Sequence, residues 1–241
     1  GIWALTADAT AGEALRQQAA RLPEVERPVV LIGELPELDY LLSLRGEEGV
    51  RFDRILGRNP FTALRPQRSQ KTSEVFRPLI ARLLPDGRLV LTQVIPRHTQ
   101  RLYELVSWGR ATALRDKVAA AEEAIYADAA DPLVNWDADD LRAALAAAGL
   151  VDVRLSVEEQ TEERRITAGH LERWFPISAA EGSHPGAEGT GARLSYGERL
   201  LTGGLTVAEG GKVAKLFREQ LTEQTVSWRS RLAFVVGAKE R

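Results

Sequence analysis

The sequence contains no cysteine and no methionine among its 241 residues, and only three histidines. Without cysteine there can be no disulfide, no thiolate nucleophile and no Cys-ligated zinc or iron–sulfur site. The three histidines, His98, His170 and His184, do not pair at a metal-ligand spacing such as i, i+4, so no metal site is expected. The absence of Met, including at position 1, indicates a fragment, a processed chain or a sequence from which residues have been lost.

Long apolar runs are also missing. No stretch approaches the ~20 apolar residues that a membrane-spanning helix needs, and the N-terminus lacks the basic and apolar regions of a signal peptide. We therefore expect a soluble, cytoplasmic protein that does not associate with membranes. The formal net charge is -2, which argues against non-specific nucleic-acid binding by the whole chain. Hydrophobic residues make up 44% and charged residues 27%, as in ordinary globular proteins.

Strand-like and helix-like stretches alternate through the first half of the chain. This alternation predicts βαβ units and an α/β fold, with a mostly parallel sheet and helices on both faces. The second half is richer in helix, with a Gly-rich stretch at 182–191 that predicts a mobile loop. The expected strands are 2–5, 29–32, 52–56, 88–94, 151–157 and 231–237, and the expected helices are 11–22, 72–84, 111–130, 141–148 and 207–224.

Charge is unevenly distributed along the chain. Residues 51–101 hold eleven Lys and Arg against three acidic residues, whereas residues 119–163 hold twelve Asp and Glu against two arginines. One interpretation is that these are solvated helix faces; the other is a basic surface that contacts nucleic acid or another anion. The candidate contacts are Arg51, Arg54, Arg58, Arg65, Arg68 and Lys71.

Four local patterns occur in a definite order. One strand leads to Asp8, a second ends in Gly33-Glu34, a third ends at Asn59-Pro60-Phe61, and a helix ends in Leu84-Pro85-Asp86-Gly87 before an apolar strand. The series resembles class I S-adenosylmethionine-dependent methyltransferases from their second strand onward. The resemblance implies a Rossmann-like core over 1–157, a helical and loop insertion over 158–230, and a terminal antiparallel strand over 231–241 that lies between the fifth and sixth strands.

The resemblance also implies roles for individual residues. Asp8 would accept hydrogen bonds from the ribose hydroxyls of S-adenosylmethionine, and Glu34, after Gly33, would accept from the adenine amino group. Asn59-Pro60-Phe61 is similar to the loop of amino-group methyltransferases, in which the Asn orients the target amine and the aromatic ring stacks on a planar substrate. Three simpler interpretations stay open: Asp8 caps a helix, Glu34 is an exposed loop carboxylate, and residues 59–61 form a plain turn.

One feature of that family is absent from this sequence. The glycine-rich loop that follows its first strand, and cradles the methionine part of the cofactor, has no counterpart here. Either that strand and loop precede residue 1, or the cofactor site has been lost. The first strand is normally central, so a sheet without it exposes the edges of two strands. A folded chain of this kind would need another segment or an oligomer partner in that position.

A weaker resemblance concerns residues 217–230 and the strand that follows them. They resemble the end of a bacterial fusion family in which a methyltransferase-like domain follows a recombination-factor AAA+ ATPase, which implies a link to DNA repair. Two hypotheses follow. The first is that the chain is a methyltransferase that acts on an amino group of a base or another planar substrate. The second is that it is a non-catalytic module that binds protein or nucleic acid beside an ATPase.

Overall fold

The computed structural model describes residues 1–64, 70–176 and 194–241, without the side chains of residues 62 and 63. It divides into two compact units. Unit 1 comprises Gly1–Gln93, Ala138–Val157 and Ala233–Arg241, and unit 2 comprises Val94–Asp137 and Glu158–Leu232. The expected core of 1–157 therefore differs from unit 1, because residues 94–137 group with unit 2 instead. The loop predicted at 182–191, and Arg65 and Arg68, lie outside the described residues.

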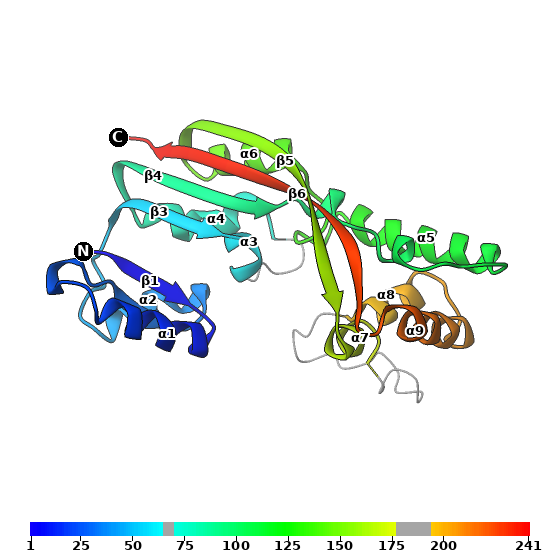
Figure 1. Ribbon diagram of the computed structural model, residues 1–241. Coiled ribbons are helices and arrows are strands. Elements are labelled where there is room, and N and C mark those ends of the chain that lie inside the picture. The colour runs from blue at the N-terminus through cyan, green and yellow to red at the C-terminus, as the bar shows by residue number, and fades with distance from the viewer. Residues whose placement is uncertain (65–69, 177–193) are drawn as a thin grey trace. The chain divides into compact units, whose positions relative to one another are not determined.

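The N-terminal part of unit 1 is a small parallel β-structure with helices around it (Figure 1). Strands β1 (Trp3–Thr6) and β2 (Val29–Ile32) pair in parallel with Thr6 opposite Ile32. Helix α1 (Ala9–Ala19) connects them and packs on both strands. Two 3-10 turns (Glu24–Glu26 and η2, Leu35–Glu37) and helix α2 (Leu38–Ser43) complete this part.

The rest of unit 1 is built on a four-stranded sheet with the order β3-β4-β6-β5. Strand β3 (Phe52–Arg58) pairs in parallel with β4 (Leu83–Val94). Strand β6 (Gln224–Lys239) lies between β4 and β5 (Leu150–Ile166), at the position expected for the terminal strand. The helices of this part are α3 (Pro60–Ala63), α4 (Thr72–Ala81) and α6 (Ala138–Ala147). The chain is thus an α/β protein, as expected, with a sheet whose strands are mixed in direction.

Buried and exposed side chains alternate along the strands of unit 1, and this alternation defines its core. Leu89 and Leu91 on β4 and Val235 on β6 are buried, whereas Arg88 and Val236, their neighbours in sequence, are exposed. The buried residues face α4 and α6, which pack against each other and lie behind the sheet in Figure 1. Their buried side chains include Phe76 and Ile80 on α4, and Leu141 and Leu145 on α6. The core therefore lies between one face of the sheet and these two helices.

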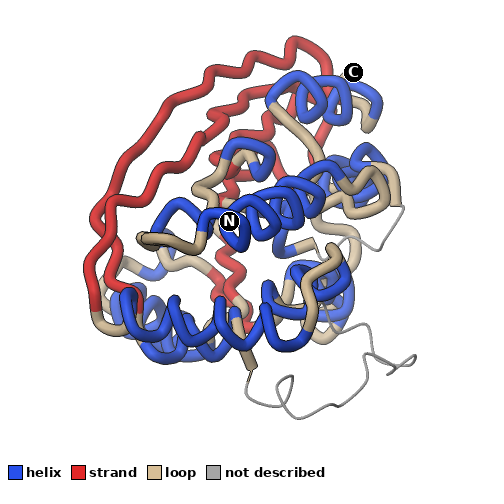
Figure 2. The backbone as a smooth tube through the Cα atoms, turned by 90° about the vertical axis from the view of Figure 1, so that its right-hand side faces the viewer, coloured by secondary structure: helices blue, strands red, loops and turns tan. Residues whose placement is uncertain are grey.

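Strands β5 and β6 extend well beyond their expected ends, as the two long red strands of Figure 2 show. Residues 158–166 and 224–230 are strand, although they were expected in a helical and loop insertion. Ion pairs join Glu159 to Arg231 and Arg165 to Glu223, so the two strands run antiparallel. Residues 158–166 carry charge in place of alternating apolar residues, which is why the sequence did not indicate a strand there.

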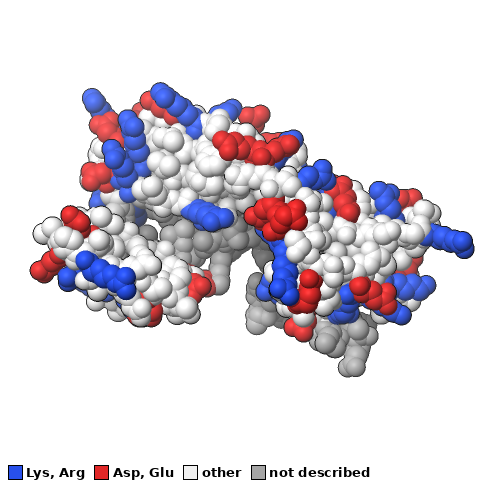
Figure 3. All heavy atoms as spheres, in the orientation of Figure 1, with Lys and Arg blue, Asp and Glu red and all other residues white. Residues whose placement is uncertain are grey.

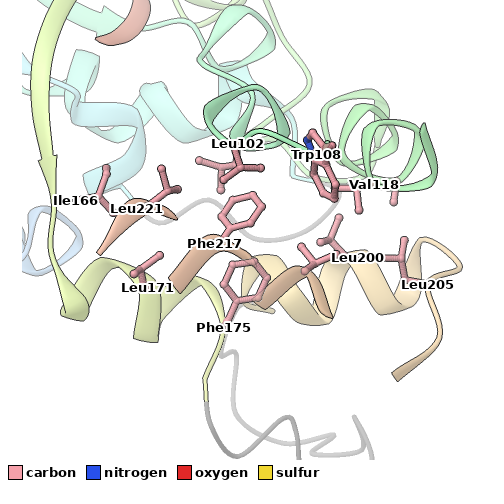
Figure 4. Packing of buried hydrophobic residues seen from close by; sticks show 13 residues of the cluster. Leu102, Trp108, Val118, Ile166, Leu171, Phe175, Leu200, Leu205, Phe217 and Leu221 are labelled. Carbon is pink, nitrogen blue, oxygen red and sulfur yellow. The ribbon is translucent and has the colours of Figure 1, made fainter. Parts of the chain in front are cut away.

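Unit 2 packs its helices around an aromatic core (Figure 4). They are α5 (Thr112–Ala127), α7 (Ala168–Trp174), α8 (Tyr196–Thr202) and α9 (Val207–Leu221), with 3-10 turns at Pro96–His98 and at Leu102–Leu105, called η4. Phe217 of α9 is fully buried and meets Phe175 edge-to-face, with ring centroids 5.2 Å apart. Trp108 and Tyr196 also contact Phe217, so this ring lies at the centre of the unit 2 core.

Candidate functional site

The carboxyl ends of β1 and β2 lie side by side and bring two predicted site segments together. The Gly33 N–H donates to the Thr6 carbonyl oxygen at 2.9 Å, which continues the parallel pairing one residue past β2. Asp8 follows Thr6 by two residues and Glu34 follows Gly33 directly. Both carboxylates are therefore at the same edge of this pair of strands, where open α/β sheets bind their ligands.

Asp8 caps helix α1. Its Oδ1 accepts a hydrogen bond from the Ala11 N–H at 3.0 Å, and its own N–H donates to the Thr6 Oγ1 at 3.2 Å. The capping interpretation of the sequence is therefore confirmed. The side chain is exposed, and a carboxylate has more acceptor sites than this one bond uses. Capping and ligand binding by Asp8 are chemically compatible.

Glu34 forms a reciprocal cap with Glu37 at the start of η2. The Glu34 carboxylate accepts from the Glu37 N–H, and the Glu34 N–H donates to the Glu37 Oε2 at 2.8 Å. Gly33 precedes it because the chain passes close to α2 there: an added Cβ would lie 2.8 Å from the Leu41 Cδ1. The Glu34 side chain is thus held in a defined place at the strand edge by local bonds.

Two hydrogen bonds join the Asn59-Pro60-Phe61 segment to β4. The Asn59 N–H donates to the Thr92 carbonyl oxygen at 2.7 Å, and the Phe61 N–H donates to the Gln93 Oε1 at 3.1 Å. Asn59 has a φ of 50°, in the left-handed region that Asn tolerates better than most residues. Gln93, which is 2% exposed, belongs to none of the predicted site motifs. A glutamine that falls in phase with Leu89 and Leu91 on β4 was the available signal.

Phe61 belongs to the core. Its side chain is 1% exposed and stacks on Phe76 with ring centroids 5.4 Å apart. A ring in this position has no free face for a planar substrate, so the structure gives Phe61 a packing role in place of the stacking role implied by the family resemblance. Pro60 is also buried, which leaves the half-buried Asn59 as the polar side chain of the segment.

The Glu34 and Asn59 segments lie close together within unit 1. Glu34 directly precedes η2, Asn59 directly precedes α3, and η2 contacts α3. An ion pair between Arg82, at the end of α4, and Asp39 of α2 also joins the N-terminal part of unit 1 to the part with the four-stranded sheet. Asp8, Gly33, Glu34 and Asn59 thus all follow carboxyl ends of parallel strands in one compact unit.

The predicted basic residues in the described part of the chain differ in their surroundings. The Arg51 guanidinium turns back onto its own loop and donates to the carbonyl oxygens of Gly49 at 3.3 Å and Val50 at 3.0 Å. Arg54 and Arg58 are exposed and lie on one face of β3. Lys71 is exposed directly before α4, and Arg65 and Arg68 are outside the described residues.

Unit 2 contains a buried carboxylate that the sequence analysis did not single out. Glu122 of α5 is 0% exposed. It accepts from the N–H groups of Leu102 at 2.6 Å and Tyr103 at 3.0 Å, and from the Tyr196 hydroxyl at 2.6 Å. Burial raises the pKa of Glu122 and of Tyr196, and it raises the pKa of the neighbouring Tyr126 to about 12. Glu122 of α5 thus caps the start of η4 and bonds to the first residue of α8.

Unit 2 also has a small apolar cavity of about 120 Å³, lined by residues that include Phe175, Leu201 and Ala214. None of the predicted site residues lines it. Within the described residues, no group of three or more His, Cys, Asp or Glu is arranged to hold a metal ion. In the same part of the chain, no helix has the length and apolar character to cross a membrane.

Comparison with known proteins gives matches at the level of structure. No family model matches the sequence, and no curated protein matches it. One similar structure is a candidate sarcosine dimethylglycine methyltransferase from Galdieria sulphuraria, at 11% identity and a TM-score of 0.40, covering 100% of this chain and 70% of that one. A candidate methyltransferase from Bacillus halodurans has 10% identity and a TM-score of 0.44, and the match covers 99% of this chain and 83% of that one. The third is Haemonchus contortus phosphoethanolamine N-methyltransferase 2 in complex with S-adenosyl-L-methionine. It has 11% sequence identity and a TM-score of 0.39, and the match covers 99% of this chain and 43% of that one.

Proposed function

We propose that unit 1 is a methyltransferase-like domain that binds S-adenosylmethionine at the carboxyl ends of β1, β2 and β3. The observation that carries the proposal is the Gly33 N–H to Thr6 oxygen bond, which places Asp8 and Glu34 at one strand edge. The contact between η2 and α3 adds Asn59 to the same neighbourhood. Ligands of open α/β sheets bind at this edge, and the order of sequence motifs resembles that of class I methyltransferases.

The residues present fit the hydroxyl and amino groups of such a cofactor. Asp8 would accept from the ribose hydroxyls through the acceptor capacity that its capping bond leaves over. Glu34, next to Gly33, would accept from the adenine amino group. When bound, the cofactor supplies an electrophilic methyl group on a positively charged sulfur.

Asn59 would orient the methyl acceptor. Its side-chain oxygen can accept a hydrogen bond from an amine and thereby hold the nitrogen in line for attack. The bonds from Asn59 to Thr92 and from Phe61 to Gln93 fix the backbone that carries this side chain. Pro60 and the buried Phe61 would restrict the segment, so they serve to position Asn59. Methyl transfer to a neutral amine needs mainly positioning and exclusion of water, and a general base is not obligatory.

Calorimetric titration of S-adenosylhomocysteine into the chain tests this proposal. We expect measurable binding that weakens at least tenfold in Asp8→Ala and in Glu34→Ala. Asp8→Asn separates two roles, because Asn caps a helix as well as Asp does but lacks the charge that strengthens a bond to a hydroxyl. It should keep the thermal stability of the parent and still bind more weakly. Glu26→Ala, which changes a carboxylate outside this strand edge, should bind like the parent. No heat at millimolar ligand would remove the proposal.

A non-catalytic module that binds protein or nucleic acid, joined to an AAA+ ATPase, is the alternative. Its support is the pair Arg54 and Arg58, which are exposed on the same face of β3. Leu56 lies between them and is 75% exposed. A large apolar side chain at the centre of the basic face favours a protein partner over a polyphosphate.

A further inference from the structure

The four-stranded sheet of unit 1 has one face that the described residues leave uncovered. Helices α4 and α6 lie behind β3, β4 and β6 in Figure 1, and no described helix of unit 1 lies in front of these strands. All-parallel sheets ordinarily carry helices on both faces, whereas sheets with antiparallel strands can leave one face to solvent. In this mixed sheet the parallel pair β3 and β4 is exposed on the side away from α4 and α6.

Apolar side chains occupy the middle of this face. The parallel register pairs Leu56 of β3 with Val90 of β4, so both side chains are on the same face. Leu56 is 75% exposed, and its partner Val90 is half-buried. On β6, Phe234 and Val236 are 36% and 39% exposed, while the alternate residues Ala233 and Val235 are buried toward the helices. Leu56, Val90, Phe234 and Val236 thus form an apolar patch, which we call the open-face patch.

Positive charge surrounds the β3 side of the open-face patch. The same register pairs Arg54 with Arg88 and Arg58 with Thr92, so Arg54, Arg58 and Arg88 share the face with Leu56. All three arginines are exposed, and none has an ion-pair partner within the described part of the chain. Figure 3, which views this face, shows mostly uncharged atoms over the strands, with Lys and Arg as well as Asp and Glu side chains near the margin.

We propose that the open-face patch is the docking surface for an amphipathic helix with an apolar side and acidic flanks. Helices are the elements that cover sheets of this kind, and an apolar stripe would bury Leu56, Val90 and the exposed residues of β6. Glutamate or aspartate beside the stripe would pair with Arg54, Arg58 and Arg88, and the charge complementarity selects against a basic helix. The occupant is a protein segment, and its docking does not depend on the binding of S-adenosylmethionine.

Fluorescence anisotropy with labelled synthetic peptides tests the proposal. The probe is an 18-residue helix with leucine at i, i+3, i+4 and i+7 and glutamate beside this stripe; its matched partner carries lysine in place of each glutamate. We expect the acidic peptide to bind at least tenfold more tightly than the basic one at low salt, and the preference to shrink as salt is added. Equal binding of the two peptides, or tighter binding of the basic one, would overturn the proposal.

Variants of the chain locate the binding surface. Leu56→Ser should weaken binding of the acidic peptide about tenfold, because it removes most of one buried leucine from the interface. Arg54→Glu with Arg58→Glu should weaken it further and reverse the preference between the two peptides. If Leu56→Ser lowers the thermal stability of the chain, Val236→Ser tests the apolar contact at a second position of the patch. Val25→Ser, at an apolar residue that is 93% exposed in the first 3-10 turn, is the matched control and should bind like the parent.

Other occupants give different results. If the patch binds nucleic acid, a 20-base-pair DNA duplex will displace the acidic peptide and Leu56→Ser will leave duplex binding unchanged. If a second copy of the chain covers the patch, sedimentation will show a dimer that Leu56→Ser dissociates. Either result contradicts the proposal, as does peptide binding that none of the variants changes.

Discussion

The side chain of Gln93 accepts a hydrogen bond from the backbone N–H of Phe61, at 3.1 Å and across 32 residues of sequence. Both groups are buried, so this bond joins the segment after β3 to the interior of β4. A buried N–H that loses its acceptor costs about 1–3 kcal/mol. The Asn59-Pro60-Phe61 segment therefore depends on a glutamine that lies far from it in the chain.

Replacement of Gln93 tests this dependence. Gln93→Leu keeps a similar volume but removes the acceptor, and it should lower the free energy of unfolding by about 1–3 kcal/mol in urea titrations. Thr92→Val is the control, because Asn59 bonds to the backbone oxygen of Thr92 and the side chain is not required. An unchanged unfolding midpoint for Gln93→Leu would show that the segment is held by other contacts.

The backbone conformation of Asn59 gives a second prediction. Its φ of 50° is costly for residues with a Cβ, although Asn is among those that tolerate it best, and it is free of strain for glycine. Asn59→Ala should therefore destabilise unit 1 by about 1 kcal/mol, whereas Asn59→Gly should stay within about 0.5 kcal/mol of the parent. Thermal unfolding of the two variants measures the difference. Equal losses in both would assign the effect to the lost amide group.

Glu122 makes the stability of unit 2 depend on pH. Burial raises the pKa of Glu122 above its ordinary value of 4.5, so the folded chain binds this proton more tightly than the unfolded chain. The resulting contribution to stability is complete below the ordinary pKa and is lost as pH rises through the raised pKa. Glu122→Gln should remove this part of the pH dependence. Urea unfolding followed by Trp fluorescence, from about pH 4 to about pH 8, measures it.

The control for this experiment is the next residue. Glu123 pairs with Arg101 at 2.8 Å, and its side chain is 51% exposed. Glu123→Gln removes a carboxylate of the same helix turn that is half-exposed, and so controls for the loss of one charge from α5. A pH profile that Glu122→Gln leaves unchanged would mean that Glu122 titrates alike in the folded and unfolded chain.

The sequence predicted the α/β class and the order of elements in unit 1 because apolar strands and capped helices alternate there with clear periodicity. Val29–Ile32 and the β4 run from Leu89 to Leu91 are examples. Gly33-Glu34 and Asp8 could be placed at strand ends because the strands that precede them are short and apolar. The Asp8 cap was predicted because its bond to Ala11 is local. The reciprocal cap of Glu34 and Glu37 is also local but was not predicted.

Other features depend on residues far apart in sequence. The burial of Phe61 follows from its stacking on Phe76, and a motif alone could not distinguish a buried ring from one at a substrate. The long β5–β6 ribbon depends on pairs such as Glu159 with Arg231, which lie 72 residues apart. The exposure of Leu56 depends on which face α4 and α6 cover. Pattern reading predicts local conformation well but does not predict which surfaces meet.

The free edges of β1 and β3 give the last prediction. Within the described residues, β1 pairs only with β2, and β3 only with β4. The ladder directs the backbone groups of Ala4 and Thr6 toward β2, and those of Ile55 and Gly57 toward β4. The N–H groups of Leu5 and Leu56 therefore point away from their sheets. Residue-resolved hydrogen exchange should show these two amides exchanging at least tenfold faster than Ala4 and Ile55. Equal protection of Leu5 and Ala4, or of Leu56 and Ile55, would mean that another strand pairs with these edges in solution.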